Sequence, residues 1–229
     1  MRVELEAGAR RRLEVVLAQL VEDPRSLTSV REPKQAWRAH VADSLTGLEV
    51  PELRAARAIA DVGAGAGFPA FPLAVALPDA RIDAIESVAR KCGFIAAAAE
   101  AAGISNVRAV NARSEEWARE TPPDGGREAY DAVTARAVAR LATLAELASP
   151  LLREGGVLVA WKGRRDPEEE AELERALEPT AMAAVRVLAV GELVGYEHRH
   201  LHVLRKAGPT PANLPRRPGI AKKRPFGAK

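Results

Sequence analysis

The fold of this chain is decided by the stretch Ala58-Ile59-Ala60-Asp61-Val62-Gly63-Ala64-Gly65-Ala66-Gly67-Phe68-Pro69. In it, an apolar run stops at a carboxylate and gives way to three alternating glycines. Glycine tolerates positive φ and has no Cβ, so the backbone N–H groups of such a turn can close on a ligand at the start of a helix. The stretch therefore predicts a buried strand, a tight turn and a helix start, with Asp61, Gly63, Gly65 and Gly67 as candidate ligand-binding residues.

The spacing of the glycines bears on the kind of ligand. The dinucleotide fingerprint is Gly-x-Gly-x-x-Gly, whereas this turn is Gly-x-Gly-x-Gly, with Phe68 where the third fingerprint glycine would fall. With an aspartate two residues before it, the pattern resembles the S-adenosylmethionine loop of the Rossmann-like methyltransferases. A tight strand-to-helix turn that binds nothing is the alternative that the glycines alone leave open.

Composition indicates one domain with a sizeable core and appendages. The chain has 229 residues, of which 47% are hydrophobic and 28% charged. Its single cysteine, Cys92, excludes an internal disulfide and a cysteine-cluster metal site, so the cytoplasm is the expected compartment. The first residues carry mixed charges, and no stretch reaches the ~18 apolar residues of a membrane span, so we expect neither export nor membrane contact.

The net charge of +3 hides an asymmetry along the chain. Residues 205–229 carry eight positive residues and no acidic one, which leaves about −5 for the rest, being 3 minus 8. A basic tail on an acidic body suits a polyanion-binding protein, although solubility alone can also produce one. Residues 209–229 contain five prolines and no periodic apolar face, which predicts a segment that is irregular or is disordered when unbound.

Two helices are predicted before the first strand. Apolar residues within 3–22 recur at i, i+3 and i+4, and a second helix begins at Pro33 and continues past Leu45. His40 and Asp43 lie three apart on this second helix, where a surface pair is the simplest interpretation. We expect a helical extension over residues 1–50.

From Ile59 onward, predicted strands alternate with predicted helices, which indicates an α/β fold with a mostly parallel sheet. We expect this Rossmann-like domain over residues 51–206, with the tail over 207–229. The seven expected strands begin at Ile59 and continue at 81–85, 106–110, 130–135, 157–161, 184–193 and 200–205.

Polar residues follow several of these strands, at what should be the ligand-bearing edge of the sheet. Glu86 comes 23 residues after Gly63, where an acid can accept the hydroxyls of an adenosine ribose, although a solvated acid at a strand end is the alternative. The segment 113–117 is expected to form a loop and a short helix beside the adenine. Arg136 and Lys162 follow the fourth and fifth strands.

Three histidines, His198, His200 and His202, alternate along the last predicted strand and share one face. A zinc site can be drawn there, but no acid or cysteine with ligand spacing accompanies them. We therefore predict no metal site.

Taken together, these motifs resemble the RsmG family, also called glucose-inhibited division protein B. The resemblance runs in family order from near residue 26 to near residue 225. It is carried by Leu27-Thr28-Ser29-Val30, His40-Val41-Ala42-Asp43-Ser44-Leu45, the glycine stretch Asp61 to Pro69, Arg90-Lys91, Ala135-Arg136-Ala137, Lys162-Gly163, Arg199-His200-Leu201 and Pro215-Arg216-Arg217-Pro218-Gly219.

The resemblance implies a class I S-adenosylmethionine-dependent methyltransferase fold and methylation of a guanine N7 in the 530 loop of 16S rRNA. It also implies 16S rRNA or the 30S subunit as partner, and we expect a monomer. Two departures are Ser26, where the family usually has Asn, and Ala70, where it usually has Gly. The family's cofactor contacts fall on Gly63, Phe68, Glu86, Ser114, Glu115 and Arg136.

Guanine N7 has an in-plane lone pair and no proton, so the implied reaction needs no general base and depends mainly on positioning. We expect Arg136 and Lys162 to flank the guanine at its O6 or at adjacent phosphates, and His40 and Asp43 to close the cleft from the N-terminal helix. Bonding N7 itself would block the nucleophile.

Three other functions remain open at this point. A nucleotide-linked dehydrogenase is opposed by the glycine spacing, and a small-molecule methyltransferase by the basic tail. A ribosome-binding assembly factor that keeps the cofactor pocket without turnover is distinguished only by an activity assay.

Overall fold

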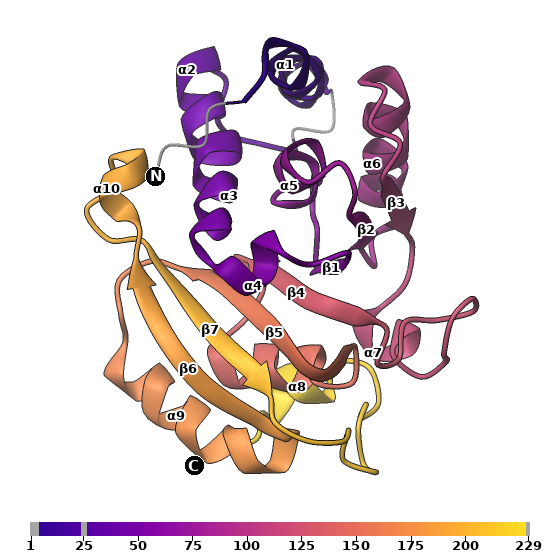
Figure 1. Cartoon of the computed structure of the whole chain (residues 1–229), viewed down its shortest axis with the longest axis vertical. Coiled ribbons are helices and arrows are strands. Elements are labelled where there is room, and N and C mark those ends of the chain that lie inside the picture. The colour runs from indigo at the N-terminus through magenta and orange to yellow at the C-terminus, as the bar shows by residue number, and fades with distance from the viewer. Residues whose placement is uncertain (1–4, 24–26, 228–229) are drawn as a thin grey trace.

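The computed structural model describes residues 5–23 and 27–227 and has a seven-stranded sheet at its centre (Figure 1). The strand order is β3-β2-β1-β4-β5-β7-β6, and β7 is antiparallel to both of its neighbours. The expected mostly parallel α/β sheet is therefore confirmed. The strands are β1 (Ala58–Val62), β2 (Arg81–Ile85), β3 (Val107–Val110), β4 (Tyr130–Arg136), β5 (Leu152–Lys162), β6 (Met182–Ala189) and β7 (His200–Lys206).

Helices cover both faces of the sheet, with α1, α5 and α6 on one side and α8 and α9 on the other (Figure 1). The α-helices are α1 (Ala7–Glu22), α2 (Pro33–Ala36), α3 (Asp43–Leu45), α4 (Pro51–Arg54), α5 (Ala70–Ala76), α6 (Ala89–Ala101), α7 (Ser114–Trp117), α8 (Leu141–Ala148), α9 (Pro167–Leu177), α10 (Gly191–Val194) and α11 (Ile220–Lys223). A π-helix, η1 (Trp37–Ala42), and two 3₁₀ turns, η2 (Thr46–Glu49) and η3 (Glu178–Thr180), complete the set.

The core lies in two layers because successive side chains of a strand point to opposite faces. Ile59 of β1 packs in the layer that contains Leu13 of α1 and Leu73 of α5. Its neighbour Ala60 packs in the other layer with Leu144 of α8. The N-terminal helices thus share a hydrophobic core with the sheet. The carboxyl ends of the parallel strands β1, β2, β4 and β5 lie along one edge of the sheet.

Two expected elements differ in the structure. The strand expected at 184–193 ends at Ala189, and residues 191–194 form α10 instead. The helix expected to run on from Pro33 is broken into α2, η1, α3 and η2, and the N–H of Asp43 reaches back five residues to the carbonyl of Arg38. Such π-turns are frequent at functional sites, and this one carries His40.

The described part of the tail, 209–227, is irregular apart from α11, which is one of the two predicted alternatives, and it packs against the rest of the molecule. Leu214 is 3% exposed, and Thr210 donates to the carboxylate of Glu128 from its backbone N–H at 3.2 Å and from its hydroxyl. The tail folds back beside α8, where it forms α11. Polar contacts to residues far away in the sequence hold much of the tail, so the tail needs no periodic apolar face.

In the described ranges, no helix has the length and apolar character needed to cross a bilayer.

Candidate active site

The glycine turn lies where β1 ends, and its backbone explains its sequence. Gly63, Gly65 and Gly67 have φ of 67°, 61° and 87°, a region that L side chains rarely adopt. A Cβ on Gly63 would lie 2.8 Å from Val138 Cγ2, and one on Gly67 would lie 2.2 Å from a ring carbon of the buried Phe71. The turn therefore needs glycine both for its conformation and for its close packing.

Asp61 stabilises this turn through hydrogen bonds to Ala70 and Thr134. Its side chain is 1% exposed, and its carboxylate accepts hydrogen bonds from the N–H of Ala70 at 3.2 Å and from the hydroxyl of Thr134 at 2.9 Å. Ala70 is the first residue of α5, so Asp61 fixes the start of that helix against β4. In this structure its contacts support the turn, and its predicted contact with a cofactor is not tested by them.

The burial of Asp61 makes the stability of the protein depend on pH. Desolvation raises the pKa of its carboxyl from 3.8 to about 7, against the lowering effect of the Thr134 hydrogen bond. The folded protein binds this proton more tightly than the unfolded chain, so the associated stability is fully present below pH 4 and is lost as the pH rises through 7. The non-titrating variant Asp61→Asn is therefore expected to lose less stability than the wild type between pH 4 and 8.

Urea unfolding of the two proteins across this pH range measures the effect. Each unit of pKa corresponds to about 1.4 kcal/mol, so the two curves should diverge by a few kcal/mol. Because the other carboxylates titrate in both proteins, only the difference between the curves reports on Asp61. Parallel curves would show that the buried carboxyl titrates normally.

A cavity of about 410 Å³ opens beside the glycine turn. Its walls come from the ends of β1 and β2, from the start of α7, from the segment after β4, from α8 and from the tail. The residues that line it are Val62, Gly63, Ile85, Ser87, Ala112, Arg113, Ser114, Glu115, Val138, Ala139, Thr143, Leu147, Gly219, Ala221, Lys222 and Lys223. The sequence-predicted Gly63, Ser114 and Glu115 are brought together here.

Glu86 follows β2 and stands in the sequence between Ile85 and Ser87, which line the cavity, but it is not itself a lining residue. It is 6% exposed, and its two carboxylate oxygens accept one backbone hydrogen bond each, from Gly65 at 3.0 Å and from Val88 at 2.8 Å. A carboxylate has about four lone-pair sites, so Glu86 is held in one orientation with capacity left for two hydroxyls. The bare turn, the cavity and this fixed acid fit an adenosine-containing cofactor such as S-adenosylmethionine.

Of the predicted substrate residues, Arg136, His40 and Asp43 lie together at the neighbouring end of β4, around the buried carboxylate of Asp43. Asp43 is fully buried and accepts from Arg136 Nη1 at 2.9 Å, from Arg199 Nε at 2.6 Å and from Arg199 Nη2 at 2.5 Å. Arg136 Nη1 also donates to the carbonyl of Ala39 at 2.7 Å. These bonds fasten the segment from η1 to α3 to the edge of the sheet, so Asp43 positions both arginines.

His40 and Phe68 lie beside this cluster. Their ring centroids are 5.0 Å apart, and the guanidinium of Arg136 stands 6.0 Å over the Phe68 ring. His40 Nε2 is 3.0 Å from the hydroxyl of Thr28. Burial, assisted by the charge of Arg136, lowers the pKa of His40 from 6.5 to about 4, so its imidazole is neutral at pH 7.

Lys162 ends β5, and its side chain is held on the side of α9. Its Nζ donates to Glu169 Oε1 at 2.6 Å and to the carbonyl of Ala139 at 3.2 Å. Contact of Lys162 with a substrate stays a prediction. The structure thus brings Arg136, Asp43, His40 and Phe68 together and directs Lys162 to an internal ion pair.

The three histidines do not share a strand as predicted. His198 precedes β7, whereas His200 and His202 lie on it. His202 is 3% exposed, and His200 Nδ1 lies 2.9 Å from the carbonyl of Gly163. Within residues 5–23 and 27–227, no group of three or more His, Cys, Asp or Glu side chains is arranged to hold a metal ion.

Sequence reasoning missed several residues of this region. Arg199 was quoted only as part of a family motif, and nothing local marked Val138, Thr143 or Gly219 as neighbours of the cavity. Ser26, one of the two departures from the family pattern, lies outside the described residues. Ala70, the other departure, contributes its N–H to Asp61 and so needs no particular side chain.

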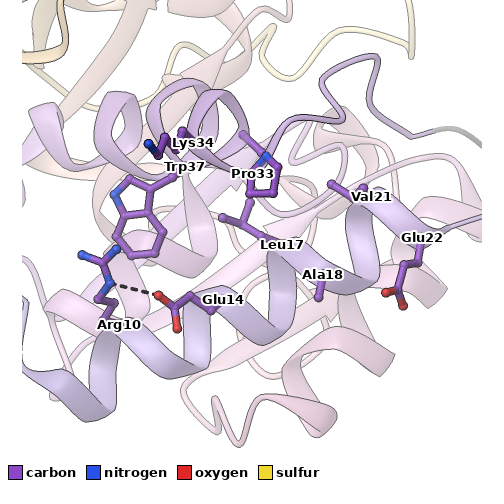
Figure 2. Close-up of a pocket in the computed structure, with 10 residues that line it drawn as sticks. Arg10, Glu14, Leu17, Ala18, Val21, Glu22, Pro33, Lys34 and Trp37 are labelled. Atoms are coloured by element: carbon purple, nitrogen blue, oxygen red, sulfur yellow. Dashed lines mark hydrogen bonds and ion pairs between the residues drawn. The ribbon is translucent and has the colours of Figure 1, made fainter.

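A second cavity, of about 560 Å³, lies between α1 and α2 (Figure 2). Arg10 crosses it, with its guanidinium 4.5 Å from the centroid of the Trp37 ring and its Nε 2.9 Å from Glu14 Oε1. Its lining includes no residue from the strand ends or from the glycine turn. In an open α/β sheet, ligands bind at the carboxyl ends of the strands, so the smaller cavity is the candidate cofactor site.

Solved structures support the fold. A SAM-dependent methyltransferase from Aquifex aeolicus matches with a TM-score of 0.57 at 17% identity, over 80% of this chain and 97% of that one. The O-methyltransferase from Bacillus cereus in complex with SAH matches with a TM-score of 0.57 at 17% identity, over 89% and 93%. At these identities the likeness concerns the fold alone, which is that of the class I methyltransferases.

Sequence relatives are more specific. Ribosomal RNA small subunit methyltransferase G from Rubrobacter xylanophilus is 45% identical over 205 residues, 88% of this chain and 77% of the relative. The protein of the same name from Desulfitobacterium hafniense is 34% identical over 99% of this chain and 93% of its own length. The family model described as rRNA small subunit methyltransferase G matches residues 15–201. The chain with this glycine turn, cavity and arginine cluster therefore belongs to the rRNA small subunit methyltransferase G family.

Proposed function

We propose that this protein transfers the methyl group of S-adenosylmethionine to N7 of a guanine in the 530 loop of 16S rRNA. The observation that carries the proposal is the glycine turn with its adjoining cavity and fixed Glu86, next to the Arg136 cluster, in a chain of this family. The sheet also argues against the dehydrogenase alternative. A dinucleotide-binding sheet has the order 3-2-1-4-5-6, whereas here the antiparallel β7 stands between β5 and β6.

The residues suit a displacement that needs no general base. When bound, the cofactor supplies a methyl group on sulfonium sulfur; the bond from guanine N7 to carbon forms as the carbon–sulfur bond breaks and its electron pair returns to sulfur. Asp43, the carboxylate of the arginine cluster, is bonded by two guanidinium groups and is not placed to take a proton. Cys92 is buried on α6, and burial raises the pKa of its thiol, so it does not suit a nucleophile.

The remaining task is to hold the base in line with the methyl group. Phe68 lies beside the glycine turn and is 6% exposed, with neutral His40 packed against its ring. Because aromatic side chains stack on unpaired bases in RNA recognition, this pair of rings suits the border of a base site. Arg136 lies at the same edge and, in this proposal, bonds guanine O6 or an adjacent phosphate and leaves N7 open to the methyl group.

The tail provides a smaller RNA-binding surface than its charge count indicates. Arg205 pairs with Glu52, Lys206 is 1% exposed and Arg216 pairs with Glu146. Of the cations in 205–227, those that are exposed are Arg205, which pairs with Glu52, and Arg217, Lys222, Lys223 and Arg224. We propose that Lys222, Lys223 and Arg224 contact phosphates, which makes RNA affinity fall as salt rises.

Mapping 7-methylguanine in small-subunit RNA tests the proposal. Purified protein and S-adenosylmethionine are added to RNA and to 30S particles that lack the modification, and the modified position is read by chemical cleavage and primer extension. We expect one guanine of the 530 loop to react in at least one of the two substrates. Binding of S-adenosylhomocysteine without methylation of either would favour the assembly factor, and methylation elsewhere would reject the assigned position.

A further inference from the structure

The C-terminal segment 215–224, hereafter the strap, reaches the cofactor cavity from far along the chain. Gly219, Ala221, Lys222 and Lys223 line the cavity together with residues of β1, β2 and α7. The family model ends at residue 201, and the first half of the strap, Pro215 to Gly219, is one of the motifs that carry the family resemblance. One wall of the cavity is therefore formed by residues that lie far from the glycine turn in the sequence.

Three contacts hold the strap in place. In each of them the partner outside the strap lies on α7 or α8, two helices that also border the cavity. The N–H of Gly219 donates to Glu115 Oε1 at 2.7 Å. The hydroxyl of Thr143 donates to the carbonyl of Ala221 at 3.2 Å. Arg216 forms a two-pronged ion pair with Glu146 on α8, in which Nε lies 2.6 Å from Oε1.

These anchors are well shielded from water. Glu115 is 7% exposed, Thr143 3% and Glu146 3%. The side chain of Arg216 is 21% exposed, and its guanidinium lies 4.1 Å over the Phe226 ring. Charge-assisted bonds in such surroundings are among the stronger polar contacts. Glu115, which the family resemblance assigned to the cofactor, uses one oxygen to hold the strap.

We propose that the strap is a working part of the cofactor site, and that Arg216, Thr143 and Glu115 are positioning residues that hold it against the bound nucleoside. The inference rests on the proposed function in taking the 410 Å³ cavity as the site of S-adenosylmethionine. A strap that leaves its place opens one wall, and the apparent affinity falls in proportion to the fraction of molecules with the wall closed. Cofactor binding and strap docking then favour each other to the same extent.

The chain offers a matched pair of variants. Arg216→Gln and Arg217→Gln each remove one positive charge from neighbouring positions, but only Arg216 is paired with Glu146, whereas Arg217 is exposed. Titration calorimetry with S-adenosylhomocysteine is expected to give a Kd about tenfold higher for Arg216→Gln and close to wild type for Arg217→Gln. Thr143→Val should weaken binding in the same direction, and Thr143→Ser, which keeps the hydroxyl, should restore it.

Thermal unfolding separates positioning from a general loss of stability. The variants are compared without ligand and with saturating S-adenosylhomocysteine, and the rise in Tm on binding reports affinity by mass action. We expect this rise to shrink for Arg216→Gln and Thr143→Val even if their ligand-free Tm values match that of Arg217→Gln. Trypsin provides a test on the wild-type chain, because cleavage after Lys222 or Lys223 should slow when S-adenosylhomocysteine is bound.

Wild-type affinity in both Arg216→Gln and Thr143→Val, with unchanged trypsin cleavage, would overturn the role of the strap. Failure of the wild-type protein to bind S-adenosylhomocysteine at all would instead overturn the proposed function. The two failures are thus distinguishable in the same set of titrations.

Discussion

Replacement of Arg136 by alanine is expected to lower methyl transfer by about 10²-fold or more while the chain stays folded. The guanidinium is one of the polar groups at the edge where the base must lie, and it also holds the carbonyl of Ala39. Removing it takes away a contact to the guanine or its phosphate and loosens η1, which carries His40. Asp43 keeps its two bonds to Arg199, so no uncompensated charge is left in the interior.

Single-turnover transfer of a labelled methyl group to small-subunit RNA measures this effect. Arg140→Ala is a matched control, since Arg140 follows β4 by four residues but pairs with Glu172 on α9. S-Adenosylhomocysteine titration of Arg136→Ala distinguishes loss of the cofactor from loss of the substrate. Unchanged turnover would remove Arg136 from the substrate site and leave it the task of holding η1.

The second large effect is expected at Asp43, on stability. Asp43→Ala leaves Arg136 and Arg199 next to each other without their shared carboxylate, with side chains that are only 13% and 24% exposed. Removing one partner of a buried ion pair costs about 3–5 kcal/mol because the remaining charge is left uncompensated. The free energy of unfolding is therefore expected to fall by that amount in urea titrations at pH 7.

The control for Asp43→Ala is a carboxylate that pairs in the same two-pronged manner at the surface. Glu170 accepts from Arg165 Nε and Nη2, both at 2.7 Å, and the side chain of Arg165 is 54% exposed. Glu170→Ala should cost about 1 kcal/mol or less. Equal losses for the two variants would show that the Asp43 cluster contributes no more than a surface pair. Restoration of stability by Arg199→Ala in the Asp43→Ala background would further support charge repulsion as the cause.

Much of the fold could be predicted from the sequence, because the relevant signals are local. The three glycines predict a tight turn because few other residues adopt positive φ. In the structure, all three have positive φ. Helix α9 (Pro167–Leu177) also begins at a local signal, since proline and acidic residues favour a helix start. Strand ends were less predictable, as β5 begins five residues before the expected position.

The candidate site was predictable in its residues but not in its connections. Glu86, Arg136 and Asp43 were each singled out by their position after a strand or within a family motif. That Asp43 is buried between two arginines depends on Arg199, which lies 156 residues away. A contact between residues so far apart cannot be predicted from a local sequence pattern. Polar residues such as these also add nothing to the apolar periodicity from which helices and strands are predicted.

By itself, the sequence determined the α/β class, the glycine turn after the first strand and the family, because each rests on backbone preference or on motifs a few residues long. Tertiary structure alone decided that the tail is ordered, that residues of the segment 215–224 line the cavity beside the glycine turn and that Asp43 holds two arginines. The physical reason is that single ion pairs and hydrogen bonds between distant residues fix these features. Such contacts depend on where the folded chain places each partner and leave no trace in the composition of either segment.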